Sequence, residues 1–485
     1  MAISLISVPM ILHALGQSDY GLYNLISGVI VMLAFLNASM TISTQRYLSV
    51  AIGEGSIEKL NRIYTSSLLL HFLLGLIIVI IFEVCYFVAF DSIFNIEESR
   101  IPAAKTIYQF LVVSMFFTIM SVPFSAVMNA KENMLAFSII DIIDSLLKLG
   151  VAYFLGKYGG DRLVFYGFAI ALISIMNTII YRLYVNFKYK EFKFSIKKYA
   201  DKETFKGMFG FAGWNTLGAM AMIGRNQGIA VIFNVFFGTI ANAAYAIANQ
   251  INGVLNNFSA TFQKALNPQL MQSEGMNNHK RLVYISMLSS RISVLVLALF
   301  AIPLIIEMPY VLKIWLKDFP ENAMQMSRLV LILSVVYQYS MGLMSAIQAV
   351  GDIKRYFIVM SSIILLNLPI CYIILRLGLP SYSCIFVFII LELISFVARL
   401  KMANKLVGIE IREFLKTVVM STLVCISLGL IASLIPHFIM AESFLRVVIV
   451  SLVYAVVYIY SAWIYALDAS TKNSIIKIIS KIIRK

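Results

Sequence analysis

The segment FGTIANAAYAI (residues 237–247) stands between two long apolar stretches of the chain. A related segment, LGQSDYGLYNL (residues 15–25), stands between the first two apolar stretches. Gly16 in the earlier segment matches Gly238 in the later one, at a distance of 222 positions. A matched break between apolar stretches is a first indication that the fold is built from two similar halves.

A second pair of segments supports this duplication. SAVMNAKENMLAF (residues 125–137) corresponds to SAIQAVGDIKRYF (residues 345–357), at a distance of 220 positions. The shift therefore stays nearly constant over more than a hundred residues. Internal repeats of this kind are common in membrane transporters, and chance similarity between apolar helices is the alternative.

The apolar character of the chain predicts a polytopic membrane protein of the all-α class. Of its 485 residues, 60% are hydrophobic and 13% are charged, and the mean hydropathy is +0.88. Apolar stretches of 18 or more residues are typical of helices that cross a membrane. We expect about 14 such helices, near residues 1–15, 20–42, 63–90, 106–130, 135–155, 163–187, 206–236, 240–267, 282–306, 323–349, 355–377, 382–403, 415–436 and 444–466.

These helices divide into two lobes of six. The N-terminal lobe covers residues 1–187 and the C-terminal lobe residues 206–404, with a basic linker at 188–205. Six is an even number, so both lobes keep the same orientation in the membrane, as a parallel repeat around a central cleft. Rocking of one lobe against the other would give alternating access.

The two ends of the chain have features of their own. Residues 1–15 are too short to cross a hydrocarbon core of about 30 Å, so either this helix is shortened or the true start lies upstream. Residues 405–466 form two additional helices, the thirteenth and fourteenth. Residues 467–485 alternate apolar pairs with lysines, which predicts a basic amphipathic helix on the inner surface; a solvated tail is the alternative.

The positive charge predicts the orientation of the chain. Its net charge is +15, and one alternating set of connections holds 26 of the 39 Lys and Arg residues, whereas the opposite set holds seven. The positive-inside rule then places both termini in the cytoplasm. The charge therefore indicates orientation and contact with anionic lipid, and no nucleic-acid partner is expected.

The sequence offers little support for an enzyme or a metal site. The four cysteines and four histidines are scattered, and they form no CxxC or HExxH pattern. The chain also lacks a phosphate-binding glycine loop and a nucleophile elbow, and no cleavable signal peptide is evident. We therefore expect a transporter without cofactors.

Polar residues recur along one face of the eighth predicted helix. Their spacing alternates between three and four positions, which places them on one side of a helix. Amides facing lipid would be costly, so this face lies against protein or water. It is either the wall of a hydrated cleft or polar contact between helices, and it comprises Asn242, Tyr245, Asn249, Asn252, Asn256, Ser259 and Gln263.

Arg225, Asn226 and Gln227 enter the same region from the seventh predicted helix. A guanidinium stays charged, so within a membrane Arg225 meets a carboxylate, a carbonyl or an anionic ligand. Its planar donors suit a phosphate, and the nearby amides suit sugar hydroxyls. Internal pairing or extension to the outer surface is the alternative. Arg46 and Lys264 are further cationic candidates, or else anchors of the orientation.

Charged residues on the fifth predicted helix are candidates for ion coupling. Asp144 and Lys148 are four positions apart and can pair on one helix face, and Asp141 is one turn earlier. Either they neutralise one another or they form a proton or sodium site. Glu83, Arg291 and Glu392 are also charged residues within predicted spans, without an assigned role.

Several short segments resemble one known family. NQG (226–228), FFG (236–238), NAA (242–244) and NPQ (267–269), together with STQRYLS around Arg46, are similar to bacterial polysaccharide transporters. These are the O-antigen-type flippases of the multidrug/oligosaccharidyl-lipid/polysaccharide exporter superfamily. The resemblance implies fourteen helices in two lobes, and cations near the substrate pyrophosphate, where Arg225 and Arg46 match.

The resemblance also implies a function in the cytoplasmic (inner) membrane of bacteria. Such flippases move undecaprenyl-pyrophosphate-linked oligosaccharide from the inner to the outer leaflet, for O-antigen, lipopolysaccharide or capsule assembly. The expected partners are this lipid-linked substrate, membrane lipids, a coupling H⁺ or Na⁺, and other polysaccharide-assembly proteins. The alternatives are a cation-coupled multidrug or small-solute exporter of the same fold, and a non-transporting scaffold of a glycan-assembly complex.

Overall fold

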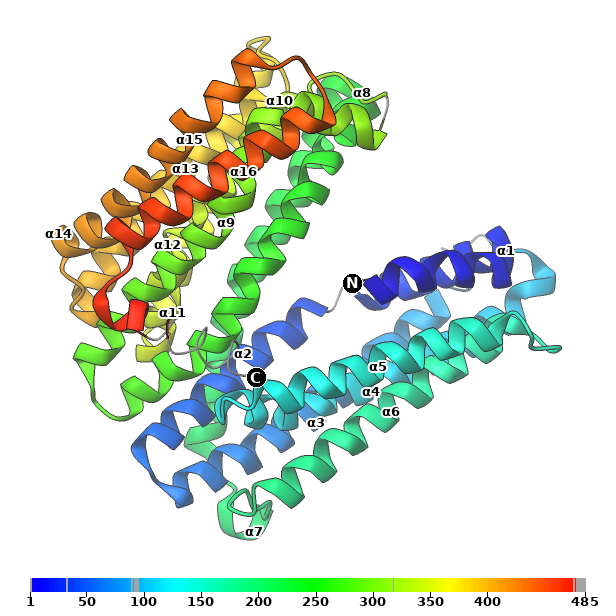
Figure 1. The fold of residues 1–485 in the computed structure, drawn as a ribbon. Helices are drawn as coiled ribbons and strands as arrows, with labels where there is room; N and C mark the ends of the chain where they lie inside the picture. The colour runs from blue at the N-terminus through cyan, green and yellow to red at the C-terminus, as the bar shows by residue number, and fades with distance from the viewer. Residues whose placement is uncertain are drawn as a thin grey trace. The chain divides into compact units, whose positions relative to one another are not determined.

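The computed structural model describes residues 2–31, 34–88, 90, 96–316, 318–473 and 476. Over these residues the regular elements are all helical, which confirms the predicted fold class (Figure 1). Contacts within the chain divide it into two compact units, Met1–Thr216 and Leu217–Lys485. Each unit is described by itself.

Unit 1 is built around α4, which packs against α2, α3 and α6. Side chains fix where several of its helices begin. The Asp161 carboxylate accepts the amide N–H groups of Leu163 and Val164 at 3.0 and 3.1 Å, which caps α6. The elements of this unit are α1 (Ala2–Val31), α2 (Ala34–Glu54), α3 (Ile57–Val88), η2 (Glu98–Arg100), α4 (Ile101–Ala130), α5 (Met134–Leu155), α6 (Arg162–Lys188), α7 (Ile196–Tyr199) and the beginning of α8 (Lys202–Gly275).

Unit 2 is built around α9, which packs against α10, α11, α15 and α16. The helices α10 and α11 meet at a bend of 41°, and together they are long and apolar enough for one span. The short elements η3 and η4 are π-helical turns that continue their neighbours. After α8, the elements are α9 (His279–Leu316), α10 (Ala323–Gln338), α11 (Met341–Val350), α12 (Lys354–Arg376), α13 (Ser383–Val407), α14 (Ile411–Phe414), η3 (Leu415–Met420), α15 (Ser421–Ile439), α16 (Phe444–Ser461) and η4 (Ala462–Ala466).

The helices are compatible with the fourteen spans predicted from the sequence, although the span at 20–42 includes residues 32 and 33, which lie outside the described residues. By length and composition, nine helices in the described residues can cross a membrane, or ten when the bent pair α10–α11 is one span. One of the nine, α8, has 74 residues and breaks at Gly238, so it contains two predicted spans. The predicted span at 135–155 coincides with α5, which carries three charged residues. The chain is thus a multi-pass, all-α membrane protein.

Both halves break at the glycines that the sequence pairs. Gly16 interrupts α1 with φ 81° and ψ 168°, and Gly238 interrupts α8 with φ 65° and ψ −154°. Such backbone angles are almost closed to residues with a side chain. Each glycine therefore makes the same kind of break between the first two spans of its half.

The helix ends show the same duplication further along the chain. α4 ends at Ala130 and α11 ends at Val350, again 220 positions apart. The next helices begin at Met134 and Lys354, at the same distance. The internal shift seen in the sequence is therefore also a shift between equivalent helix boundaries.

The predicted linker at 188–205 is attached to unit 1. Lys131 pairs with Glu191 at 2.9 Å, and the amide of Lys193 donates to the Asn61 side chain at 2.6 Å. Burial alone would raise the pKa of Glu191, but the hydrogen bond from Lys131 lowers it below its usual range. These contacts explain why the division between the units falls after Thr216, beyond the linker. Of the predicted amphipathic tail at 467–485, residues 474, 475 and 477–485 lie outside the described residues.

The two additional helices are fixed to α9 by a buried carboxylate. Glu307, which is fully buried, accepts from His437 of α15 at 2.7 Å and from Arg446 of α16 at 2.9 Å. Gly429 lets α15 approach α16 closely, because a Cβ there would lie 2.8 Å from the Tyr454 ring. α15 and α16 are therefore an integral part of unit 2.

Candidate functional site

Arg225 lies on the part of α8 before the Gly238 break, where it is half-buried. Its guanidinium stands over the ring of Phe388, 5.0 Å from the ring centroid, and donates to the Asn226 side-chain oxygen at 3.3 and 3.1 Å. A ring face and a neutral amide do not neutralise a guanidinium. The positive charge of Arg225 is therefore not neutralised by these two contacts, and it can attract an anion in the adjacent space.

Glu392 and Arg399 form a buried ion pair on α13. They are seven positions apart, or two helical turns, so their side chains meet on one face, in a contact between Glu392 Oε1 and Arg399 Nη1. Arg399 also donates to Ser340 at 2.9 Å and to Tyr356 at 3.3 Å. Glu392 is 9% exposed and Arg399 is 3% exposed. Glu392, which had no assigned role from the sequence, is therefore the ion-pair partner of Arg399.

The amides of α8 reach the same place from another side. Asn256 donates to the Asn252 side-chain oxygen at 2.8 Å, and Ser334 of α10 donates to the same oxygen. Gln338 of α10 donates to the Asn256 oxygen at 3.0 Å. The remaining Gln338 oxygen is buried without a hydrogen-bond partner among the described residues. Buried polar atoms are seldom left in this way, and those that are call for a water or a ligand.

These groups enclose one cavity of about 310 Å³ within unit 2. Its wall carries two guanidinium groups and one carboxylate, so it has an excess of one positive charge. Amide and hydroxyl groups supply both donors and acceptors. Such a cavity suits an anionic, hydroxyl-rich group. The lining residues at the centre of this argument are Arg225, Asn252, Asn256, Gln338, Glu392 and Arg399.

The rest of the polar face on α8 has other surroundings. Asn242 donates to the carbonyl of Ala230 at 3.0 Å, and Asn249 to the carbonyl of Tyr245 at 3.0 Å. Tyr245 is itself buried, with its ring against Phe233. These amides are therefore largely satisfied by the backbone.

Further along α8 the polar face forms contacts between helices. Gln263 donates to Ser293 of α9 at 2.6 Å and accepts from Ser289 at 2.9 Å, and Ser259 donates to the Ser293 carbonyl at 3.4 Å. Both side chains are buried. The face thus divides into a cavity wall at Asn252 and Asn256, with Ser259 at its edge, and a helix contact at Gln263.

The remaining predicted site residues lie elsewhere. Asn226, Gln227 and Lys264 are exposed side chains of α8. Arg46, in unit 1, stands over the rings of Tyr47 and Phe211 at 4.9 and 5.0 Å.

The charged residues of α5 form the pair that their spacing predicts. Lys148 contacts Asp144 at 2.8 Å, and Asn177 of α6 donates to Asp144 at 2.5 Å. Tyr181 donates to Asp141 at 3.4 Å. Among the other charged residues within spans, Glu83 accepts from Gln109 at 3.3 Å, whereas Arg291 pairs with Asp468 at 2.7 Å.

Sequence reasoning missed Arg399, which lies near the end of the predicted span at 382–403 and counts among the cations of the cytoplasmic connection. The signal was present, because Arg399 follows Glu392 by two helical turns within an apolar stretch. It also missed Glu307, whose partners His437 and Arg446 are 130 and 139 positions away. For that contact no local signal exists in the sequence.

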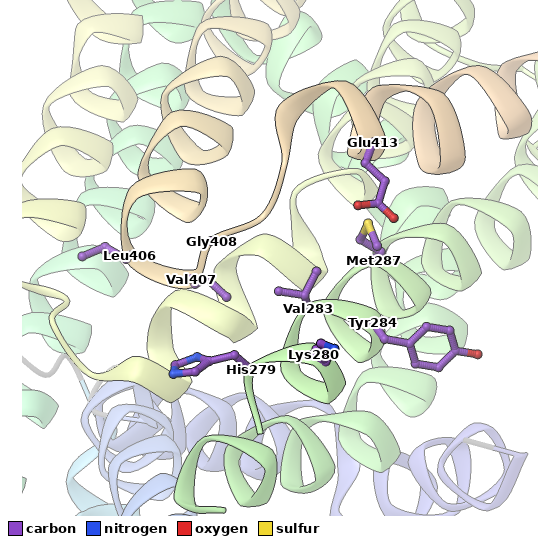
Figure 2. A pocket seen from close by; sticks show the side chains of 9 residues that line it. All are labelled: His279, Lys280, Val283, Tyr284, Met287, Leu406, Val407, Gly408 and Glu413. Carbon is purple, nitrogen blue, oxygen red and sulfur yellow. The ribbon is translucent and has the colours of Figure 1, made fainter. Parts of the chain in front are cut away.

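A second cavity of unit 2, of about 600 Å³, lies where α9 begins and α13 ends (Figure 2). His279 and Lys280 stand at the start of α9, and Figure 2 shows Glu413 of α14 pointing toward Met287. Nearby, Tyr284 donates to Asp468 at 3.3 Å. This cavity contains none of the charged residues within the spans, so we place the candidate site at Arg225 and Glu392.

The fold of the chain is similar to that of solved MATE proteins. Residues 1–154 match the family model described as MatE. An outward-facing multidrug resistance MATE family transporter of the MOP superfamily matches with a TM-score of 0.73 and 13% identity, over 84% of this chain and 93% of that chain. A MOP superfamily transporter from Pyrococcus furiosus matches with a TM-score of 0.71 and 15% identity, over the same shares.

A MATE protein in the straight conformation also matches, with a TM-score of 0.70 and 15% identity over 84% of this chain and 96% of that chain. No curated protein matches the chain in sequence. The structural likenesses extend over most of the chain but rest on low identity, so they establish the fold that it adopts.

Proposed function

We propose that the chain is a flippase that moves a pyrophosphate-linked oligosaccharide on a polyprenyl lipid from the inner to the outer leaflet of the bacterial cytoplasmic membrane. The product would serve surface polysaccharide assembly, such as O-antigen or capsule. One observation carries the proposal: the cavity of unit 2 combines Arg225, the Glu392–Arg399 pair and the amides Asn252 and Asn256. Its excess positive charge suits a phosphate, and its amides suit sugar hydroxyls.

The physical benefit of such a cavity is large. Each sugar hydroxyl that enters hydrocarbon without a hydrogen bond costs about 2–7 kcal/mol, so an oligosaccharide does not cross a bilayer unaided. A polar cavity replaces the lost water contacts while the polyprenyl tail stays in lipid. Alternating access between the leaflets, with H⁺ or Na⁺ as the coupling ion, completes the proposed mechanism.

The second candidate is a cation-coupled multidrug exporter, which the fold comparisons favour. The matched structures include one described as a multidrug resistance transporter. The Pyrococcus furiosus transporter is described as having a binding pocket of reversed polarity, which suggests a different function for that protein. Pocket polarity is therefore the feature on which the two candidates differ, and the cavity here is polar and positive.

The deciding experiment uses the full chain in vesicles. A fluorescent polyprenyl-pyrophosphate oligosaccharide is placed in both leaflets, and an added quencher reports exchange between them. We expect faster exchange than in protein-free vesicles, and no uptake of a cationic dye under an H⁺ or Na⁺ gradient. Dye transport without saccharide exchange would support the exporter. No transport of either substrate would support a scaffold. Either of these two outcomes, dye transport alone or no transport, would contradict the proposal.

A further inference from the structure

Unit 1 contains a groove of about 740 Å³ formed by α3, α4, α6 and the start of the linker. The volume is within the range of small-molecule and lipid-chain sites. Apart from Thr178, Arg182 and Asn186 on α6 and the hydroxyl group of Tyr64, its lining is apolar. The residues that matter here are Leu69, Phe72, Phe116, Ile179, Arg182 and Phe194.

The groove has ordered walls. The linker is held against α3 by the amide of Lys193, which donates to Asn61 at 2.6 Å, and Phe192 packs edge-on to Tyr64 with ring centroids 5.5 Å apart. A Cβ at Gly75 of α3 would lie 2.9 Å from the ring of Phe116 on α4. Gly75 therefore lets this ring, which lines the groove, lie against α3.

Arg182 differs from the other cations within the spans. It is exposed, it lines the groove, and it forms no hydrogen bond or ion pair within the described part of the chain. Six Lys and Arg residues lie in predicted spans and belong to neither set of charged connections, and five of these six have polar partners. Those five are Lys148, Arg225, Arg291, Arg328 and Arg446.

We propose that this groove binds an anionic phospholipid, with an acyl chain against the aromatic wall and the phosphate at Arg182. Phe72 and Ile179 are 43% and 49% exposed, so the groove opens along an apolar face that suits acyl chains. The linker is predicted on the cytoplasmic side, where the leaflet carries anionic lipid. A zwitterionic lipid offers no net charge to match the guanidinium, so the site is selective for acidic head groups. None of its lining residues lines the proposed transport cavity, and the proposal does not depend on that cavity.

The test measures the melting temperature of the full chain in neutral detergent. Phosphatidylglycerol should raise it with a saturable midpoint, phosphatidylcholine with the same acyl chains should raise it less, and glycerol 3-phosphate should leave it unchanged. R182A should need roughly five-fold more phosphatidylglycerol to reach the midpoint of the rise in melting temperature. This change corresponds to about 1 kcal/mol per basic residue at an anionic surface. I179W should also weaken the response, because the indole fills the groove.

The matched control is K190A, which removes an exposed cation of the same linker that does not line the groove. It should respond to phosphatidylglycerol as the unchanged chain does. Equal responses of R182A and the unchanged chain would overturn the proposal. So would equal effects of the two lipids on the unchanged chain, a comparison that requires no variant to fold. A response to glycerol 3-phosphate alone would indicate a phosphate site without a lipid, and would also overturn it.

Discussion

Helices α6 and α13 occupy equivalent places in the duplication, since Arg162 and Ser383 begin them 221 positions apart. α13 carries the buried pair Glu392 and Arg399, and the same shift leads to Ala171 and Thr178 on α6. Thr178 donates to two backbone carbonyls at 2.8 and 2.9 Å, so it needs no charged partner. The halves thus share helix boundaries and glycine breaks, while a cavity with a buried ion pair belongs to the second half. The two halves are therefore alike in where their helices begin and end, and they differ in the buried charged side chains that they carry.

Removing one member of the ion pair should have the largest effect on the stability of the second half. E392Q should destabilise unit 2 by about 3–5 kcal/mol, because it leaves the guanidinium of Arg399 buried and unpaired. R399M should cost less, because a carboxyl can take up a proton whereas a guanidinium cannot lose one. Chemical unfolding in detergent measures both.

A suitable control for the ion-pair variants is E83Q in unit 1, where Glu83 has an amide neighbour instead of a cation. Its loss should be small. Equal losses for E392Q and E83Q would show that the Glu392–Arg399 contact does not stabilise the second half.

The close contact of α11 with α9 is a second difference between the halves. A Cβ at Gly342 would lie 2.0 Å from the carbonyl oxygen of Ser286, whereas the equivalent position on α4 is Val122. G342A should therefore force the helices apart and cost about 1–3 kcal/mol. Thermal unfolding tests this against G253A, where a Cβ meets nothing within 4 Å. If G342A is as stable as G253A, the helices are not in the contact described.

The glycine breaks are a feature that the two halves share, so equivalent substitutions there should have equal effects on stability. G16A and G238A should each cost about 1–2 kcal/mol through backbone strain alone, since both sites are open around the Cβ position. G21A, at an open helical position, is the control and should be nearly neutral. Unequal losses at the two breaks, measured by unfolding, would argue against equivalent roles.

The smallest expected effect concerns a charged cluster found in the first half. Arg100 contacts Asp19 at 2.5 Å and Asp161 at 2.8 Å, whereas the position equivalent to Asp161 in the second half is Tyr382. Burial alone would raise the pKa of Asp161, but hydrogen bonds from Arg100 and from the backbone lower it. The contact therefore stabilises the fold above the usual carboxyl pKa and weakens as pH falls through the lowered value.

D161N isolates this charge, because asparagine can still cap α6. The loss at neutral pH should be below about 1 kcal/mol, since the groups are partly exposed. Melting temperatures between pH 7 and pH 3 should fall less steeply for D161N than for the unchanged chain. If the melting temperatures of D161N and the unchanged chain fall in parallel with pH, the cluster does not contribute to the loss of stability in acid.

Much of the fold could be predicted from the sequence because membrane helices are defined by local composition. Over the described residues, the predicted spans fall on helices, although the span at 20–42 is shared by α1 and α2 and the span at 323–349 by α10 and α11. The match of Gly16 to Gly238 anticipated both breaks. The site was harder to predict. The spacing of the amides placed Asn252 and Asn256 on one face, but it could not show that Gln263 contacts α9.

The missed residues follow from the same limit. The spacing of Glu392 and Arg399 within one apolar stretch indicates their pairing, but Tyr356, another partner of Arg399, is 43 positions away on another helix. Likewise, Glu307 is buried by helices that come 130 or more positions later. Contacts between distant helices depend on packing, which hydropathy and helix periodicity do not encode.

The proposed role of the second half rests on Arg225 as the cation that receives a phosphate. The most direct measurement is binding of a polyprenyl-pyrophosphate saccharide to the full chain in detergent, compared among the unchanged chain, R225A and R225K. We predict that R225A binds at least ten-fold more weakly, the change expected for a hydrogen bond to a charged group, and that R225K recovers part of the affinity. Unchanged binding by R225A would contradict the assignment of this cavity to the substrate head group.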